Sequence, residues 1–333
     1  MIRTAWKQNG TIRVDAFTLR RITPSEIRIK VTACGICGTD LHVTPGGDPK
    51  PVQFGHEIAG TILELGSAVM GLTVGQSVAL DSSTPCGRCA NCRNMQQELC
   101  SDIQSFFCIN SFGMADEMIT PAINAVPAPD MDPAVACLSE PLGVAIDMVR
   151  LAEITPASNV LVIGAGAIGL MAIALARRAG ARRIYCSQSA RRPARCALAA
   201  QFGATIIDSR RTPLKNYAFD GPINRIMVTA PPAALAEAFS VASKGAIISF
   251  IGIEYGAGAE CRFDANEFHF KKLQLRASFA SPAIFTPQAL TFLREGVVDG
   301  PALISHRFKL DDVAEAMSVA RDAPDALKVI VTP

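Results

Sequence analysis

The segment Val160-Leu-Val-Ile-Gly164-Ala-Gly166-Ala-Ile168-Gly169 decides how the chain is expected to fold. An apolar run precedes the glycines, and an alanine-rich helical stretch, 167–179, follows them. A GxGxxG motif in this setting is typical of dinucleotide-binding folds. Its first glycine allows a tight turn, the second lets the backbone approach a pyrophosphate, and the third lets the helix pack on the strand. We therefore expect Gly164, Gly166, Ile168 and Gly169 to contact a dinucleotide, helped by the free amides of the helix N-terminus.

The regions before and after this motif differ in their pattern of apolar residues and turn residues. Residues 1 to about 140 show short β-type runs between glycine, proline and aspartate clusters, whereas apolar strands and helices alternate from there to about 276. Such alternation predicts an α/β fold with a doubly wound parallel sheet covered on both faces. The expected strands are 160–163, 183–187, 205–207, 226–229 and 246–251. The expected helices are 142–153, 167–179, 191–202 and 233–242. Helices 287–296 and 311–321 and a last strand, 327–331, follow.

Composition limits the function classes. The chain has 333 residues, of which 49% are apolar and 19% charged, and its formal net charge is +2. That balance excludes extended disorder and argues against a general nucleic-acid or membrane-surface partner. The apolar run 160–176 is at the lower limit of membrane-span length, and its glycines fit the nucleotide motif better. Because Met1 to Gly10 lacks the apolar core of a signal peptide, we expect a soluble, cytoplasmic protein.

Cysteine usage indicates metal binding. An odd count of eleven cysteines in a long chain without an export signal favours ligation or catalysis over disulfides. Four of them form Cys86-x2-Cys89-x2-Cys92-x7-Cys100, which a single loop can wrap into a closed, structural, four-thiolate zinc site. Disulfides and a nucleic-acid-binding zinc ribbon are the alternatives, although ribbons more often separate two CxxC pairs by 15 to 20 residues.

A second set of candidate ligands is dispersed. Cys37 lies in Gly35-Ile-Cys37-Gly-Thr39-Asp40-Leu-His42, His56 and Glu57 follow Gly55, and Glu140 precedes Pro141. One thiolate, one imidazole, one carboxylate and a water make a catalytic zinc site with an exchangeable position. Because these residues are far apart in sequence, spacing alone does not reveal the site. Taken singly, the cysteine is equally well explained as a core residue, the histidine as a packed side chain and each glutamate as a surface acid.

The end of the second expected strand bears on cofactor choice. It reads Tyr185-Cys-Ser187-Gln-Ser189-Ala-Arg191-Arg192, without the acid that usually binds the ribose 2′-hydroxyl of NAD. Small hydroxyl groups followed by arginines suit a 2′-phosphate, because guanidinium groups bind phosphate through paired, charge-assisted hydrogen bonds. We predict that Ser187, Ser189, Arg191 and Arg192 favour NADP(H) over NAD(H). The alternative is a solvated, basic helix start.

Taken in order, these motifs resemble the zinc-dependent medium-chain dehydrogenase/reductase superfamily. The Glu140-Pro pair resembles the sequence found at this point in the polyol branch of the family. That branch includes sorbitol, threonine and galactitol-phosphate dehydrogenases. The resemblance implies a GroES-like β-rich catalytic domain, 1–141 and 277–333, with a zinc lobe at 84–102, and a Rossmann domain, 142–276. It also implies one catalytic and one structural zinc per subunit. Cys37 and His56 would ligate the catalytic zinc, with Glu57 and Glu140 as the carboxylate candidates.

The resemblance further implies hydride transfer between NADP(H) and a secondary alcohol or ketone of a polyol, sugar, sugar acid or cyclitol. Thr39 and His42 would relay the proton, with Glu57 as a further catalytic candidate, and the backbone at Ile251 and Gly252 would hold the nicotinamide. An NAD-dependent threonine-type amino-alcohol dehydrogenase and a non-catalytic, zinc-stabilised nucleotide-binding regulator are the alternatives. We expect a small polyhydroxylated substrate, a homodimer or homotetramer, and neither nucleic acid nor membrane as partner.

Overall fold

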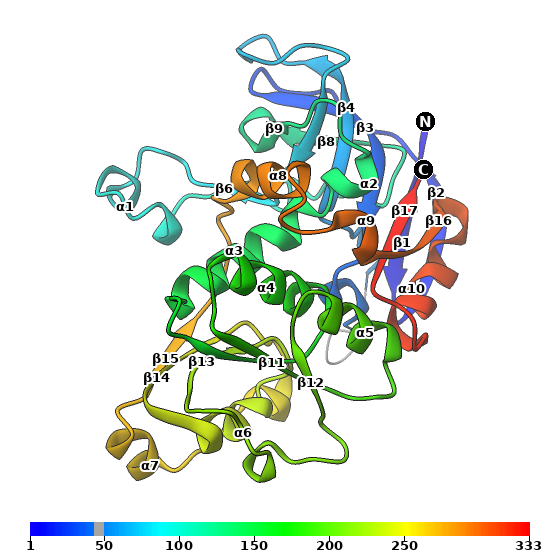
Figure 1. Cartoon of the computed structure of the whole chain (residues 1–333). Coiled ribbons are helices and arrows are strands. Elements are labelled where there is room, and N and C mark those ends of the chain that lie inside the picture. The colour runs from blue at the N-terminus through cyan, green and yellow to red at the C-terminus, as the bar shows by residue number, and fades with distance from the viewer. Residues whose placement is uncertain (43–49) are drawn as a thin grey trace. The chain divides into compact units, whose positions relative to one another are not determined.

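The computed structural model describes residues 1–42 and 50–333, which divide into two compact units. Unit 1 comprises Met1–Gly143 and Ala280–Pro333, and unit 2 comprises Val144–Phe279. Figure 1 shows the course of the chain and the element labels used below. No helix in these described stretches is both long and apolar enough to cross a membrane.

Unit 1 is built on a seven-stranded sheet with the order β16-β17-β3-β4-β5-β9, in which β8 also pairs with β3. Its strands are β3 (Glu26–Gly35), β4 (Glu57–Leu65), β5 (Ser77–Leu80), β8 (Glu117–Pro121), β9 (Ala125–Pro127), β16 (Ile304–Lys309) and β17 (Lys328–Thr332). Alternate residues of β3 and β4, among them Ile27, Ile29, Ile58 and Ile62, are almost fully buried and form its core. The end of the chain thus completes the sheet that its first third begins.

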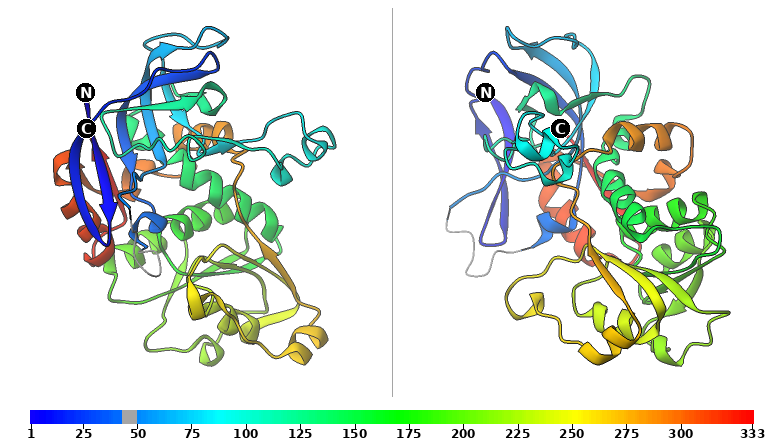
Figure 2. Two further views of the ribbon diagram at one scale, coloured as in Figure 1. Left: turned by 180° about the vertical axis from the view of Figure 1, so that it is seen from behind. Right: turned by 90° about the vertical axis from the view of Figure 1, so that its left-hand side faces the viewer.

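Shorter elements complete unit 1. The β1–β2 hairpin and β17 bring the two chain ends close together, as both views in Figure 2 show. The strands outside the main sheet are β1 (Ile2–Gln8), β2 (Thr11–Phe17), β6 (Ser83–Thr84) and β7 (Gln104–Ser105). The α-helices are α1 (Ala90–Arg93), α2 (Pro133–Ala136), α3 (Ser139–Ala152, which continues into unit 2), α8 (Thr286–Arg294), α9 (Gly300–Leu303) and α10 (Val313–Asp322). The 3-10 helices are η1 (Gly38–Leu41), η2 (Gln97–Leu99), η3 (Ala122–Asn124) and η6 (Leu310–Asp312).

Unit 2 is a six-stranded, fully parallel sheet with the order β12-β11-β10-β13-β14-β15. Its strands are β10 (Asn159–Ile163), β11 (Arg183–Gln188), β12 (Thr205–Asp208), β13 (Ile223–Val228), β14 (Ala242–Phe250) and β15 (Gln274–Ala277). Its helices are α4 (Ala167–Arg178), α5 (Pro193–Gln201), α6 (Ala234–Val241) and α7 (Ala265–Phe270), with 3-10 turns η4 (Leu214–Asn216) and η5 (Gly256–Ala259). In Figure 1, α4 and α5 cover one face and α6 the other. The doubly wound α/β fold is therefore confirmed, and the strand order reverses beside β10, where such sheets bind ligands.

The structure differs from the sequence expectations at two places that matter. Helix α3 begins at Ser139 and not at 142, which places Glu140 in its first turn. Strand β15 and helix α7 were not expected, because Gln274-Leu-Arg-Ala alternates weakly and carries a charge. Strand β15 is the last strand of the sheet's order and pairs only with β14 in the described chain, so the long-range pairing, not the local pattern, makes it a strand.

Candidate functional site

The glycine loop in unit 2 has the geometry that a dinucleotide requires. Gly164 adopts a left-handed φ of 99°, which a residue with a side chain rarely adopts. A Cβ on Gly166 would meet nothing within 4 Å, so the backbone is open to a ligand there, directly before α4. A Cβ on Gly169 would lie 2.1 Å from the Gly164 carbonyl oxygen. The three glycines thus serve the turn, the approach of a ligand and the close packing of the helix.

Two side chains that the sequence analysis did not single out hold this loop. The Thr229 hydroxyl, just after β13, donates to the Gly164 carbonyl at 2.8 Å. The Gln188 side-chain oxygen, at the end of β11, accepts from the Ala165 amide at 2.7 Å. Strands β11 and β13 lie on either side of β10 in the parallel sheet. Their carboxyl ends therefore lie at the same edge as the glycine loop that follows β10. In the sequence, the only indication of these two contacts was a polar residue at the end of an apolar strand.

The structure brings the predicted cofactor-selecting residues to the turn between β11 and α5. The Ser187 hydroxyl is buried without a hydrogen-bond partner, and Ser189 Oγ accepts from the Arg191 amide at 3.3 Å. Arg192 directly precedes α5. Arg195, which the sequence analysis missed, lies in the first turn of α5. Burial, together with the nearby Arg192 cation, lowers the pKa of Arg195 below its usual range. Two cations thus lie close together at this turn, where the Asp208 carboxylate of β12 accepts from the Ala190 amide at 3.2 Å.

The end of β14 also lies at this edge of the sheet. The Ile251 amide donates to the Val228 carbonyl at 3.1 Å, and a Cβ on Gly252 would lie 2.2 Å from the Ala230 carbonyl oxygen. A side chain at 252 would therefore force the segments after β13 and β14 apart. Glycine at this position keeps the two backbones in contact.

The four cysteines of the loop 86–100 converge as their spacing predicts. Their sulfur atoms all lie within 4.8 Å of one another, and all four thiols are free. The backbone amide of Cys86 donates to Cys100 Sγ at 3.3 Å, and that of Cys89 donates to Cys86 Sγ at 3.4 Å. Backbone hydrogen bonds lower the pKa of Cys89 to about 6, whereas loss of solvent raises that of Cys92 to about 12. The loop is preorganised for a tetrahedral zinc ion.

Three of the dispersed candidates lie near enough to influence one another electrostatically, although among the described residues only the four cysteines of the lobe have ligand atoms within 4.8 Å of one another. Cys37 follows β3, His56 precedes β4 and Glu140 lies in the first turn of α3. Burial alone would lower the pKa of His56, but the adjacent Cys37 thiol, with which it can hydrogen-bond, and Asp40 raise it well above its usual value. Loss of solvent raises the pKa of Glu140 to about 7. A thiol, an imidazole and a carboxyl are donor groups that suit a divalent zinc ion.

Asp40 fixes the two loops that carry Cys37 and His56. Its carboxylate is almost fully buried and accepts from the Cys37 amide at 2.9 Å and from the Gly55 amide at 3.3 Å. It also lies 3.6 Å from His56 Nδ1. A carboxylate in this place orients the ring and both ligand-bearing loops without itself being a ligand.

Glu57 is placed differently from the other carboxylate candidate. It is fully buried, and its two oxygens lie 2.6 and 2.7 Å from the ammonium nitrogen of Lys328, the first residue of β17. Burial would lower the pKa of Lys328, but the Glu57 carboxylate outweighs it, so the pKa is raised. The sequence analysis missed Lys328, because one lysine before a Val-Ile-Val run looks like an exposed strand end.

The proposed relay residues lie next to Cys37. Thr39 is exposed in the 3-10 turn η1, two residues after Cys37, and His42 ends the same turn, half-buried. The Lys7 ammonium donates to the His42 carbonyl at 2.9 Å and to the Asp40 carbonyl at 3.1 Å, which fixes the turn. A proton path from Thr39 to His42 remains a prediction.

An aromatic wall borders His56. The Phe107 ring lies 5.8 Å from the imidazole and stacks at 5.0 Å on Phe106, which is fully buried. Phe112 meets Phe107 edge to face at 5.2 Å. Because these three rings are held by one another, Phe107 presents a rigid and partly exposed apolar face beside the metal-binding candidates.

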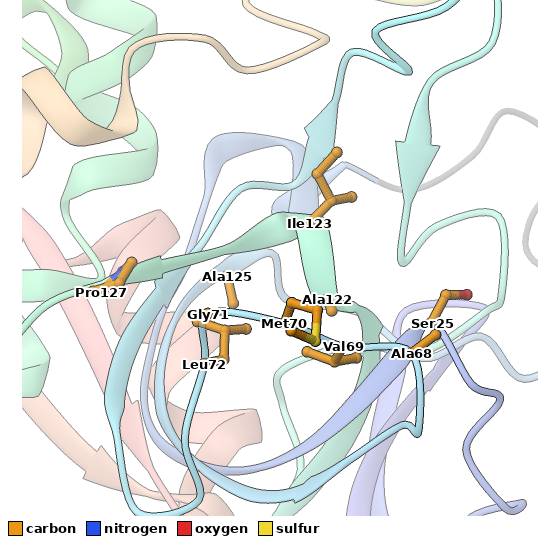
Figure 3. Close-up of a pocket in the computed structure, with 10 residues that line it drawn as sticks. All are labelled: Ser25, Ala68, Val69, Met70, Gly71, Leu72, Ala122, Ile123, Ala125 and Pro127. Atoms are coloured by element: carbon orange, nitrogen blue, oxygen red, sulfur yellow. The ribbon is translucent and has the colours of Figure 1, made fainter.

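A surface hollow of about 420 Å³ lies elsewhere on unit 1, between the turn around Met70 and the segment 122–127 (Figure 3). Its lining is aliphatic apart from Ser25, and none of the candidate site residues contributes to it. Without a titratable or metal-ligating side chain, this hollow offers no chemistry.

Known proteins with the same domains place the chain in a family. Residues 23–130 match the model of the alcohol dehydrogenase GroES-like domain, and residues 167–295 match that of zinc-binding dehydrogenase. The chain is 30% identical to an L-idonate 5-dehydrogenase from Vitis vinifera over 96% of its length and 91% of the relative's. It is also 30% identical to an L-threonine 3-dehydrogenase from Mesorhizobium japonicum, covering 95% and 94% of the two chains.

Solved structures agree with the sequence relatives. A zinc-binding dehydrogenase from Sinorhizobium meliloti bound to NADP superimposes with a TM-score of 0.87 at 28% identity, covering 100% of this chain and 99% of that one. An alcohol dehydrogenase from E. coli CFT073 complexed with NADH gives 0.88 at 26% identity and the same coverage.

The fold, the metal-binding candidates and these relatives together define a zinc-dependent dehydrogenase. The chain belongs to the zinc-dependent medium-chain dehydrogenase/reductase superfamily, in the branch that contains the polyol and threonine dehydrogenases. It is an oxidoreductase acting on alcohol groups with a nicotinamide cofactor, and its substrate is a small molecule. The non-catalytic regulator is thereby set aside.

Proposed function

We propose that the protein transfers hydride between NADP(H) and a secondary alcohol or ketone of a polyol, sugar, sugar acid or cyclitol. The observation that carries this proposal is that Asp40 holds Cys37 and His56 together: its carboxylate accepts from the Cys37 amide at 2.9 Å and lies 3.6 Å from His56 Nδ1. Glu140 lies near enough to His56 to influence it electrostatically. Relatives named L-idonate 5-dehydrogenase and L-galactonate-5-dehydrogenase support a polyhydroxylated substrate.

The metal that this family binds would be held by Cys37, His56 and a carboxylate, and a second ion by the four cysteines of the lobe. A zinc ion held in the open site would polarise a carbonyl and would make an alcohol hydroxyl, otherwise a very weak acid, easier to deprotonate. Asp40 keeps the Cys37 and His56 loops in register. Phe107 shields one side of the site from water.

The proton of the substrate hydroxyl needs a path to solvent. Thr39 begins it, because its hydroxyl both accepts and donates a hydrogen bond and stands two residues from Cys37. His42 ends it, since an imidazole ring can accept a proton at one nitrogen and donate one from the other. Both lie in the one fixed turn, η1.

NADP(H) is the proposed cofactor, with NAD(H) the weaker one. Strand β11 itself ends in Gln188, which binds the glycine loop, and the Asp208 carboxylate at the end of the adjacent β12 accepts from the Ala190 amide at 3.2 Å. Arg191, Arg192 and Arg195 crowd positive charge at the turn that follows. Ser187 adds an unpartnered buried hydroxyl. This set favours a ligand with an extra phosphate over one with two free ribose hydroxyls.

The cofactor proposal is tested by the double variant Arg191→Ala/Arg192→Ala. We expect the KM for NADP to rise by about ten- to hundredfold, since one or two charge-assisted hydrogen bonds are lost, and the KM for NAD to change little. Arg182→Ala is the matched control, because it removes an exposed arginine before β11. Equal effects on both cofactors, or better use of NAD by the unaltered protein, would contradict the assignment.

An NAD-dependent threonine-type activity is the second candidate, because several relatives are named L-threonine 3-dehydrogenase. A panel of polyols, sugar acids and amino alcohols, followed by nicotinamide absorbance, separates the two. Turnover of L-threonine with NAD, and none of any polyol, would replace the first proposal by the second.

The remaining proposals concern assembly and compartment. We propose a homodimer or homotetramer, as is common in the family, which sedimentation or light scattering would measure. We also propose that the enzyme works in the cytoplasm, where a reducing environment keeps the zinc-binding thiols available.

A further inference from the structure

Lys7 of strand β1 contacts two segments that carry candidate site residues. Its ammonium nitrogen donates to the Asp40 carbonyl at 3.1 Å and to the His42 carbonyl at 2.9 Å. Its backbone exchanges two hydrogen bonds with Val52, at 2.8 and 2.9 Å, in the segment that leads to His56. The side chain and the backbone of one residue therefore hold both the turn η1 and the segment before His56.

The turn η1 depends on such contacts because it is short. A 3-10 helix of four residues makes few hydrogen bonds of its own, and the carbonyls at the end of a helical turn lack amide partners within it. The Asp40 carboxylate fixes the start of η1 by accepting from the Cys37 amide at 2.9 Å. The last turn contains no basic residue, so the Lys7 ammonium, from another strand, supplies the cation that stabilises this end.

Strand β1 gives the Lys7 side chain a fixed base. All seven residues of β1 pair with β2. On the opposite edge, the Ala5 amide donates to the Met114 carbonyl at 2.8 Å, and the Arg3 carbonyl accepts from the Asp116 amide at 3.0 Å. The Lys7 side chain itself is half-buried. A group presented from a strand that is hydrogen-bonded on both edges positions its partners more precisely than a group on a loop does.

We propose that Lys7 is a positioning residue of the reaction, whose ammonium fixes η1 so that the Thr39 hydroxyl and the His42 imidazole keep the separation that proton transfer needs. Donor and acceptor must lie within hydrogen-bond reach, directly or through one water, and a displacement of about 1 Å can lower a rate about a hundredfold. In this role Lys7 neither carries the proton nor touches the substrate. The inference rests on the proposed function, because it assumes the path from Thr39 to His42.

Lys7→Met tests this role, because it removes the donor protons and keeps an unbranched side chain. In single turnovers of the zinc-loaded enzyme with NADP and alcohol, we expect oxidation to slow by about ten- to hundredfold, with both KM values changed less than about twofold. The ratio of the rates in H2O and D2O should rise, because proton transfer becomes the slower step. Lys7→Arg still donates to the two carbonyls and should keep nearly the unaltered rate. Lys30→Met, which changes an exposed lysine, is the matched control.

A double variant separates positioning from a general effect on stability. If Lys7 acts through the relay, Lys7→Met/His42→Ala should be hardly slower than His42→Ala alone, because an interrupted path has little more to lose. A lysine that only stabilises the unit would slow both backgrounds by the same factor. Amide hydrogen exchange over residues 38–42 should also become about tenfold faster in Lys7→Met, with or without substrate and cofactor, because the end of the turn opens more often.

An unaltered rate and H2O/D2O ratio in folded Lys7→Met would overturn the proposal, as would equal slowing in both backgrounds. If Lys7→Met does not fold, Lys7→Gln keeps one amide donor and should show the same changes at a smaller size, and an unaltered rate there is equally decisive. The relay variants separate the two proposals. Ordinary rates in both Thr39→Val and His42→Ala would mean that the proposed proton path fails, whereas slow relay variants beside an unaffected Lys7→Met would mean that only this inference fails.

Discussion

The two groups of metal-binding candidates in unit 1 are assembled in opposite ways. The lobe draws Cys86, Cys89, Cys92 and Cys100 from fifteen consecutive residues, and backbone amides of the same loop donate to its sulfur atoms. The open site draws Cys37, His56 and Glu140 from three elements and needs the sheet to bring them together. A closed site built locally can be altered without disturbing the rest of the unit, whereas the open one depends on every strand that frames it.

The largest expected effect comes from the open site. Cys37→Ser should lower kcat/KM by about a thousandfold or more, because it removes a ligand of the ion that stabilises the developing charge. Metal content should fall by one ion per chain while the circular dichroism spectrum is retained. Cys108→Ser is the control, since that thiol is exposed and outside both groups. If Cys37→Ser kept the kcat/KM of the unaltered enzyme, the open site would have no catalytic role to distinguish it from the lobe.

A substitution in the four-cysteine lobe should lower stability more than activity, unlike a substitution in the open site. Cys100→Ser is expected to lose one metal ion and to lower the midpoint of thermal unfolding, because the loop 86–100 has lost a ligand that also accepts from the Cys86 amide. Activity measured below that midpoint should fall far less than in Cys37→Ser. Loss of both ions on this single substitution would show that the two groups are coupled.

Gly35→Ala probes how the sheet supports the open site. Its new Cβ would overlap Glu57 Oε2, so we expect a loss of about 1–3 kcal/mol in the free energy of unfolding and faster loss of metal from the open site. Gly38→Ala is the matched control, because a Cβ there meets nothing within 4 Å. Equal denaturation curves and metal release for both variants would mean that the strand tolerates the added methyl group.

The smallest expected effect concerns a buried acid away from both groups. Burial raises the pKa of Asp81 to about 7, although its hydrogen bond from Thr286 opposes the rise. The folded protein thus binds this proton more tightly than the unfolded chain does. Its contribution to stability is full below about pH 4 and is lost as the pH rises through about 7.

Asp81→Asn should therefore flatten the decline of the thermal midpoint between about pH 4 and pH 7. Asp130→Asn, which changes an exposed acid, should leave that decline as it is. An unchanged pH profile in Asp81→Asn would show that another group is responsible.

Local patterns predicted the parts of the molecule whose cause is local. The strand–GxGxxG–helix unit and the four-cysteine loop were both read from short segments, and the structure has both. Strand β15 was missed because its pairing with β14, not its own residues, makes it a strand. The contacts that Thr229 and Gln188 make with the glycine loop were missed for the same reason, since that loop follows a different strand, β10.

By itself the sequence determined the nucleotide loop, the thiolate lobe and the alternation of strand and helix, because each depends on spacings within one turn, one loop or one repeat of elements. Only the tertiary structure decided that Glu57 pairs with Lys328 while Glu140 lies beside His56. Both are glutamates close to a possible ligand, and nothing in their local sequence distinguishes them. The difference arises where β3 lies between β17 and β4, because Gly35 leaves the space that the Glu57 carboxylate occupies when it meets Lys328.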